Sequence, residues 1–203
     1  MARLLYTVLF YLSLPLFILH LISRGQKAPA YLQRWGERFA LNGIELNRCI
    51  WVHAVSMGEV IASIPLVEKL LLHYPALPVL ITTMTPTGSE RVKAAFGDRV
   101  HHVYCPYDLP GPINRFLDAV NPQMLIIMET ELWPNLLHYT ARRAIPIVLA
   151  NARLSARSAK GYQRVRWLTR PMLEKLNIVA AQAQPDGDRF LSLGLDKSHL
   201  AIT

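Results

Sequence analysis

Acidic residues that follow apolar runs are the first candidates for chemistry in this sequence. Glu59 comes shortly after the run Cys49–Val55. Glu129 and Glu131 come directly after the run Met124–Met128. A carboxylate at the end of a buried strand needs a partner or a task, because an isolated buried charge is costly. Two carboxylates that lie close together raise the pKa of one of them, which prepares that group for general base catalysis.

Structural roles compete with the catalytic ones. Ser56 and Glu59 have the Ser-x-x-Glu spacing of a capping box at a helix start, so capping and catalysis both stay open for Glu59. Glu131 can complement a helix dipole from the first turn of a helix. Glu129 has no such structural role. Gly58 is expected to let the backbone turn tightly and a ligand approach closely.

The elements that must position these residues alternate between short β-rich runs and helical stretches. This order predicts a Rossmann-like α/β fold, a parallel sheet with helices on both faces. The expected strands are Cys49–Val55, Val79–Met84, Val100–Tyr104, Met124–Met128, Ile145–Ala150 and Ile178–Ala181, and another begins at Ala201. The expected helices are Glu59–His73, Ser89–Phe96, Pro112–Val120, Glu131–Ala144, Gly161–Leu176 and Asp186–Leu193.

In such sheets, ligands bind beyond the carboxyl ends of the strands, where the strand order reverses. The common order 3-2-1-4-5 makes strands 1 and 4 neighbours, about 4.8 Å apart. Glu59 and Glu129 are therefore expected to face one crevice.

Other strand ends are polar as well. Thr85 and Thr87 suit sugar hydroxyls or a phosphate, or else form a turn with a helix cap. Arg153, Ser155 and Arg157 follow the fifth strand, where arginine can grip a phosphate; the alternative is a solvated basic helix face. The formal net charge of +8 also favours phosphate-bearing partners.

Several site types have no support in the sequence. It contains neither GxGxxG after the first strand nor GxxxxGK[ST], which argues against a dinucleotide or P-loop site. Cys49 and Cys105 are far apart and are expected to be free thiols. No His/Cys cluster indicates zinc, and His53 and His73 are expected to be packed or surface residues.

Residues 1–24 are expected to anchor the chain in a membrane. Thirteen of the residues in Leu4–Ile22 are Leu, Ile, Val or Phe, just enough apolar chain to span a bilayer. A cleaved signal peptide is disfavoured, because no small-residue cleavage site follows; a buried soluble helix is the other alternative. Basic residues lie mostly after the run, at Arg24 and Lys27 and beyond, so the remainder is expected in the cytoplasm.

Residues 25–48 are expected to form a basic interfacial segment and residues 49–203 the folded domain. Tyr31, Trp35 and Phe39 interleave with Arg34 and Arg38 at helical spacing, which is typical of a helix in the headgroup layer or of a solvated linker helix. Because Thr203 falls just after the start of a strand, the sequence is expected to continue beyond it.

Five motifs occur in order along the chain: WVHAVSMGE, ITTMTPTGSERV, YCPYDLPGPINRFL, METELWPNL and ANARLSARSAKGY. Together with the basic N-terminal anchor, they resemble the 3-deoxy-D-manno-octulosonic acid (Kdo) transferases of lipopolysaccharide assembly. The resemblance implies the N-terminal half of an inverting GT-B glycosyltransferase that needs no metal or other cofactor. It also implies that Glu59 is the general base and that Glu129 is a second functional carboxylate.

The partners implied by the resemblance are a bisphosphorylated lipid A precursor as acceptor and CMP-Kdo as donor, with no nucleic acid. The donor site lies mostly in a second domain beyond this chain, so the chain alone is expected to be inactive. The implied location is the cytoplasmic face of the inner membrane. Two alternatives remain: another GT-B enzyme acting on lipid-linked sugars, and a membrane-bound, non-enzymatic acceptor-binding module.

Overall fold

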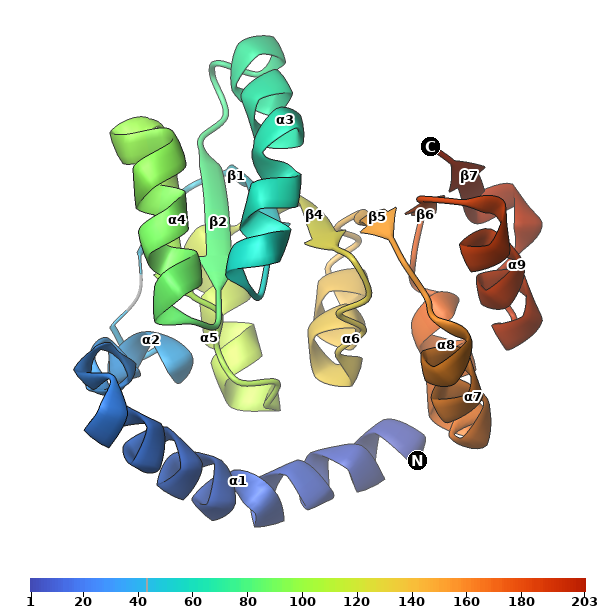
Figure 1. The fold of residues 1–203 in the computed structure, drawn as a ribbon, viewed down its shortest axis with the longest axis horizontal. Helices are drawn as coiled ribbons and strands as arrows, with labels where there is room; N and C mark the ends of the chain where they lie inside the picture. The colour runs from blue at the N-terminus through green and yellow to red at the C-terminus, as the bar shows by residue number, and fades with distance from the viewer. Residues whose placement is uncertain (43) are drawn as a thin grey trace.

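Seven parallel strands form the centre of the molecule. The computed structural model describes residues 1–42 and 44–203, apart from the Lys27 side chain, and its strand order is β3-β2-β1-β4-β5-β6-β7 (Figure 1). The Rossmann-like fold class and the predicted adjacency of the first and fourth strands are therefore confirmed. The strands are β1 (Cys49–His53), β2 (Val79–Thr83), β3 (His101–Tyr104), β4 (Pro122–Met128), β5 (Ile147–Ala152), β6 (Ile178–Ala181) and β7 (Leu200–Ile202).

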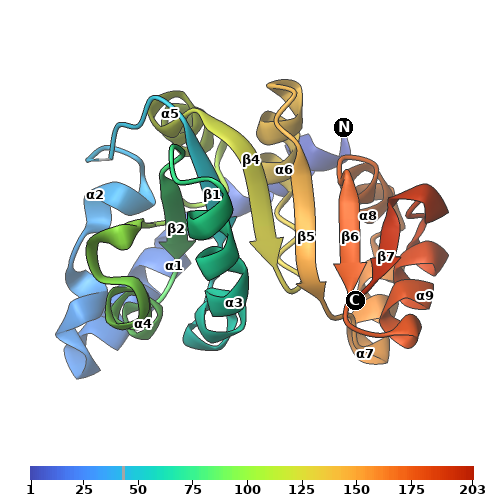
Figure 2. The same cartoon turned by 90° about the horizontal axis from the view of Figure 1, so that it is seen from above.

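Helices cover both faces of this sheet (Figure 2). The chain moves outward from β1 to β3 and then returns to β4, so right-handed crossovers place the later helices on the opposite face. One face carries α3 (Met57–His73) and α4 (Pro86–Phe96). The other carries α5 (Pro110–Val120), α6 (Pro134–Arg142), α8 (Arg166–Leu173) and α9 (Gln184–Leu193), and α7 (Ala156–Arg164) packs beside α8 and α9.

Two apolar layers hold the helices on the sheet. Val60 and Val92 belong to the layer under α3 and α4, whereas Phe116, Leu136 and Phe190 belong to the layer on the other side. All five residues of β1 are buried, as expected for a strand covered on both faces. The core therefore fixes the carboxyl ends of β1 and β4 side by side.

The N-terminal helix α1 (Ala2–Lys27) passes along the carboxyl edge of the sheet in Figure 1. It is the one helix in the described part of the chain that is long and apolar enough to cross a membrane. The expected helix from Tyr31 to Phe39 is not continuous. A 3-10 helix at Pro29–Leu32 and the four-residue α2 (Trp35–Arg38) replace it, and Arg38 is only 1% exposed because it packs against the domain.

Two other predicted helix bounds are wrong. Glu131 does not lie in the first turn of α6, because that helix begins at Pro134. The single helix expected over Gly161–Leu176 is two helices, which meet at Val165, where the backbone leaves helical geometry (φ −112°, ψ 35°). Short 3-10 turns at Gly97–Arg99 and Lys197–His199 lead into β3 and β7.

Candidate functional site

The loops after β1 and β4 lie side by side, because His53 and Ile127 pair in register at the ends of these strands. The first of these loops leads into α3, whose first turn contains Glu59. The Val55 N–H donates to Glu59 Oε2 and the Ser56 hydroxyl donates to Oε1, both at 2.8 Å. The Glu59 N–H in turn donates to Ser56 Oγ at 3.4 Å, which completes the predicted capping box. Each carboxylate oxygen is thereby held in a fixed orientation.

Glu59 holds a proton more tightly than an ordinary glutamate. Its side chain is only 6% exposed, and this burial raises its pKa from 4.5 to about 7. The hydrogen bonds from Ser56 and Val55 oppose the shift, while the charges of Glu131 and Glu129 add to it. A carboxylate with a pKa near neutral pH can accept a proton and still be ionised in a large fraction of molecules.

Glu129 and Glu131 approach Glu59 from the loop after β4. Glu129 has a positive φ of 57°, a conformation that L-residues other than Asn and Asp adopt rarely, and its N–H donates to Ala150 O at 3.0 Å. Burial raises the pKa of Glu131, although a hydrogen bond from Trp133 opposes this. The structure thus brings together the three predicted carboxylates. Among the described residues, however, they do not form a set that could hold a metal ion.

His53 and Trp133 hold the Glu131 side chain in place. His53 is fully buried, and burial lowers its pKa to about 3, so its ring is neutral. The ring packs edge-on against the Trp133 indole, with centroids 4.8 Å apart. Trp133 Nε1 then donates to Glu131 Oε2 at 2.8 Å. Sequence reasoning missed this support because His53 and Trp133 lie 80 residues apart in the chain and meet only when β1 pairs with β4.

Gly58 does not serve the tight turn that was expected. It lies inside α3 with a negative φ, so the backbone there requires no glycine. A Cβ at this position would have only Ser56 Oγ nearby, at 3.9 Å. The other expectation for Gly58, an open approach for a ligand, is compatible with this empty space beside Ser56.

The basic residues after β5 are exposed on the far side of the same edge. Arg153 and Arg157 take part in no ion pair among the described residues, so their guanidinium groups are available to solvent. Ser155 caps α7 by accepting from the Ser158 N–H at 3.1 Å. The Thr130 hydroxyl donates to the Arg153 carbonyl, which ties this loop to the loop carrying Glu129.

Thr85 and Thr87 occupy the start of α4. Thr85 Oγ1 accepts from the Gly88 N–H at 3.1 Å, which is the helix-cap alternative, whereas Thr87 is exposed. Gly88 is needed for this close packing, because an added Cβ would lie 3.0 Å from Thr85 Oγ1.

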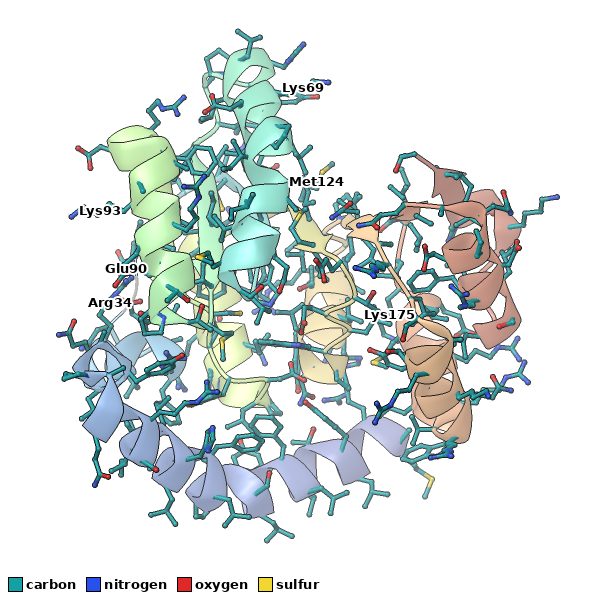
Figure 3. The ribbon with its side chains drawn as sticks, viewed as in Figure 1. Arg34, Lys69, Glu90, Lys93, Met124 and Lys175 are labelled. Atoms are coloured by element: carbon teal, nitrogen blue, oxygen red, sulfur yellow. The ribbon has the colours of Figure 1, made fainter. Side chains whose placement is uncertain are left out.

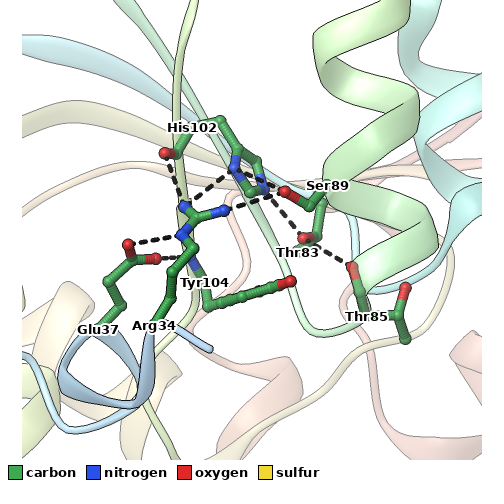
Figure 4. Close-up of polar contacts among 7 residues, drawn as sticks. All are labelled: Arg34, Glu37, Thr83, Thr85, Ser89, His102 and Tyr104. Carbon is green, nitrogen blue, oxygen red and sulfur yellow. Dashed lines mark hydrogen bonds and ion pairs between the residues drawn. The ribbon is translucent and has the colours of Figure 1, made fainter. Parts of the chain in front are cut away.

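A polar cluster lies beside this helix start (Figure 4). Arg34 donates to Glu37 at 2.7 Å, to Ser89 at 3.0 Å and to the His102 carbonyl at 3.2 Å. Glu37 also accepts from the Tyr104 N–H at 2.7 Å. Arg34 therefore fastens the chain before β1 to the domain, although the residue stays exposed, and the basic interfacial segment stays a prediction.

Asp108 is the acid that caps α6, in place of Glu131. Its carboxylate accepts from the N–H groups of Asn135 at 3.0 Å and Leu136 at 2.6 Å. Burial raises the pKa of Asp108 to about 6, and the two backbone N–H groups oppose the shift. Asp108 thereby joins the loop after β3 to the start of α6.

Comparison with known proteins shows which family this chain is similar to. Residues 33–203 match the family model of 3-deoxy-D-manno-octulosonic-acid transferase (kdotransferase). The chain is 47% identical over its whole length to the 3-deoxy-D-manno-octulosonic acid transferase of Haemophilus influenzae, and it covers 48% of that protein. It is 35% identical to the Bordetella pertussis protein of the same name, over 96% of this chain and 47% of that protein. The chain thus spans about half the length of the curated relatives it matches.

Solved structures support the fold. The chain resembles the UDP-GlcNAc 2-epimerase of Neisseria meningitidis with a TM-score of 0.56 at 15% identity, over 77% of this chain and 46% of that one. A similar match is found to a UDP-N-acetylglucosamine 2-epimerase described as putative, from Listeria monocytogenes, with a TM-score of 0.56 over 78% of this chain. At this identity the likeness shows a shared Rossmann-like fold and nothing about the reaction.

Proposed function

The chain belongs to the Kdo transferase family, and on that premise we propose that its domain binds the acceptor when Kdo is transferred from CMP-Kdo to a lipid A precursor. The observation that carries the proposal is Glu59, a buried carboxylate with a raised pKa of about 7 at the point where the strand order reverses. In open α/β sheets this point is where ligands bind.

The proposed step is an inverting displacement without a metal ion. Glu59 accepts the proton of an acceptor hydroxyl as that oxygen forms a bond to the anomeric carbon of Kdo. The bond from that carbon to the CMP phosphate oxygen breaks, and CMP leaves with the electron pair. Positioned base catalysis of this kind typically contributes about 10²–10⁴-fold in rate. Burial keeps the Glu59 pKa high, the charges of Glu131 and Glu129 add to the shift, and these two carboxylates orient the acceptor or stabilise developing positive charge.

The acceptor phosphates are assigned to the exposed basic edge after β5. Arg153 and Arg157 are free of ion pairs among the described residues. Arg153 belongs to the loop that Thr130 ties to the carboxylates, and Arg157 follows in the first turn of α7. Arg153→Ala should therefore raise the acceptor KM and weaken its dependence on salt. Arg99→Ala is the matched control, because Arg99 pairs with Glu68 at 2.7 Å away from the crevice. An unchanged KM for Arg153→Ala would contradict the phosphate assignment.

The decisive experiment is transfer by the full-length protein that carries this sequence, with CMP-Kdo in a panel of activated sugar donors. Consumption of CMP-Kdo alone supports the proposal. Consumption of another donor supports a different GT-B enzyme, and acceptor binding without any transfer supports a non-enzymatic module. Glu59→Gln should abolish transfer while acceptor binding and folding persist.

The domain is proposed to work at the cytoplasmic face of the inner membrane, where a lipid acceptor is available. The support is α1, whose apolar length suits a membrane, together with the basic residues that follow its apolar run. Recovery of the protein in the membrane fraction, and its loss from that fraction when residues 1–24 are removed, would test the location separately from transfer.

A further inference from the structure

The apolar helix α1 is fastened to the domain by polar bonds. Arg3 Nη1 donates to Asn135 Oδ1 at 2.8 Å, and Asn135 Nδ2 donates to Thr7 Oγ1 at 3.0 Å. Asn135 is fully buried at the start of α6. Farther along α1, Phe17 lines an apolar cavity of about 250 Å³ together with Trp133, the residue that holds Glu131. One side of α1 is therefore part of the domain from its first turn to beyond its middle.

This attachment is incompatible with a helix that crosses a bilayer. At about 1.5 Å per residue, α1 advances about 21 Å between Arg3 and Phe17. A crossing helix must leave the domain over a hydrocarbon layer of about 30 Å. Asn135 would then lose both Arg3 and Thr7. Its Nδ2 would keep the Asp108 carbonyl, but its buried Oδ1 would lose the donors that now satisfy it.

The opposite side of α1 is apolar and exposed. We call it the outer stripe: Leu5, Leu9, Leu12, Leu16 and Leu19, which recur at alternating spacings of four and three residues and therefore share one helix face. Their exposed fractions run from 52% to 71%. The side chains that flank the stripe are exposed and mainly apolar too, among them Leu4, Val8 and Ile22.

The flanks and the charges indicate what covers this side. A coiled-coil partner, such as a second copy of the chain, normally requires charged residues beside the leucine stripe, and here the flanks are apolar. Residues 1–36 contain basic residues but no acidic one, since the first acid is Glu37. Trp167 is 51% exposed on α8, which packs against α1, and the sequence places Arg166 directly before it. Aromatic and basic residues beside an apolar face are typical of contact with an anionic lipid surface.

We infer that α1 is a monotopic anchor, which lies in the plane of one leaflet with its outer stripe in the lipid and its other side on the domain. The N-terminus and the catalytic domain are therefore on the same side of the membrane. The inference rests on the membrane attachment included in the proposed function, but not on the sugar chemistry.

The side of the membrane from which single introduced cysteines can be labelled tests this geometry in the full-length protein. One variant carries a cysteine in a short polar extension ahead of Met1, which is fully exposed. The matched control is Lys69→Cys, since Lys69 lies near the end of α3 that is farthest from α1 (Figure 3). Cys49 and Cys105 are buried, so the parent protein serves as the blank, with any cysteines beyond this sequence replaced. A membrane-impermeant maleimide is applied to intact spheroplasts and to inverted inner-membrane vesicles.

Both cysteines should react in inverted vesicles and stay at the level of the blank in spheroplasts. Leu12→Cys, in the middle of the outer stripe, should resist the reagent from either side until detergent is added. If the N-terminal cysteine reacts in spheroplasts while Lys69→Cys does not, α1 spans the membrane and the inference is wrong. Rapid labelling of Leu12→Cys without detergent would also overturn it. Failure of sugar transfer with same-side labelling would contradict the proposed function alone.

Discussion

Replacement of Glu59 by glutamine separates the structural role of this residue from its proposed chemistry. In Glu59→Gln the side-chain carbonyl can still accept from the Val55 N–H, and the amide can donate to Ser56 Oγ, so the capping box persists. The substitution removes only the titration and the basicity. It should therefore keep the fold and abolish transfer.

The expected change in stability on replacing Glu59 follows from the pKa of this residue. A shift from 4.5 to about 7 means that the folded state binds the proton more tightly than the unfolded state. The contribution of Glu59 to the free energy of unfolding is therefore greatest below pH 4.5, falls as the pH rises from there, and levels off above pH 7. At about 1.4 kcal/mol per pH unit the loss is about 3 kcal/mol, which solvent screening at the crevice reduces to roughly 1–3 kcal/mol. For a chain of this length, that corresponds to about 2–12 °C in Tm.

Thermal melting of the wild type and Glu59→Gln at pH 5 and pH 8 measures this difference directly. The variant should gain in Tm relative to the wild type at pH 8, and much less at pH 5. Glu68→Gln is the control of opposite sign, because the hydrogen bond from Arg99 lowers the pKa of Glu68. A variant that melts below the wild type by the same amount at both pH values would refute the raised pKa and favour a capping role for the ionised carboxylate.

Substitutions at three further positions test the neighbours of Glu59. Gly58→Ala should stabilise α3 by about 0.5–1 kcal/mol and yet reduce transfer, because the new methyl group occupies the open approach beside Ser56; a fully active variant would contradict this role. Glu129→Gly and Glu129→Ala should both impair transfer, but the glycine variant should melt higher by an amount equivalent to about 1 kcal/mol, because the φ of 57° strains any L-residue. Equal melting temperatures would show that the backbone there carries no strain. Glu131→Gln should lower the pH at which transfer rises, because the Glu131 charge helps to raise the pKa of Glu59; an unshifted pH profile would exclude this coupling.

The arrangement of the sheet could be predicted because it depends on local patterns. Each strand is a short apolar run and each crossover helix follows it, so the alternation indicated the fold. The common strand order of such sheets then placed Glu59 and Glu129 at one edge. The cap at Thr85 was also predicted as an alternative, since a cap and its N–H partner are three residues apart, whereas the cap at Ser155 was missed because the helix was expected to begin at Gly161.

The errors arose where the deciding partner is distant in the chain. The start of α6 depends on Asp108, which lies 27 residues before Asn135. Arg38 is buried because Tyr104 and Met84 come from strands that follow it, with the Arg38 guanidinium 4.3 Å from the Tyr104 ring centroid. The contact of Arg3 and Thr7 with Asn135 likewise joins distant residues, and no local signal in Leu4–Ile22 could have shown it.

The bond between Thr7 and Asn135 also sets an order of events during synthesis, since the two residues are 128 positions apart. At roughly 5–20 residues per second, a ribosome adds Asn135 about 6–26 s after Thr7. Throughout that interval α1 has its apolar side available and its docking site not yet made. A helix in a peptide forms within microseconds, so α1 is helical long before α6 is made. The contact between α1 and the domain therefore forms only after α6 is made, and with it comes the burial of Asn135 against Arg3 and Thr7.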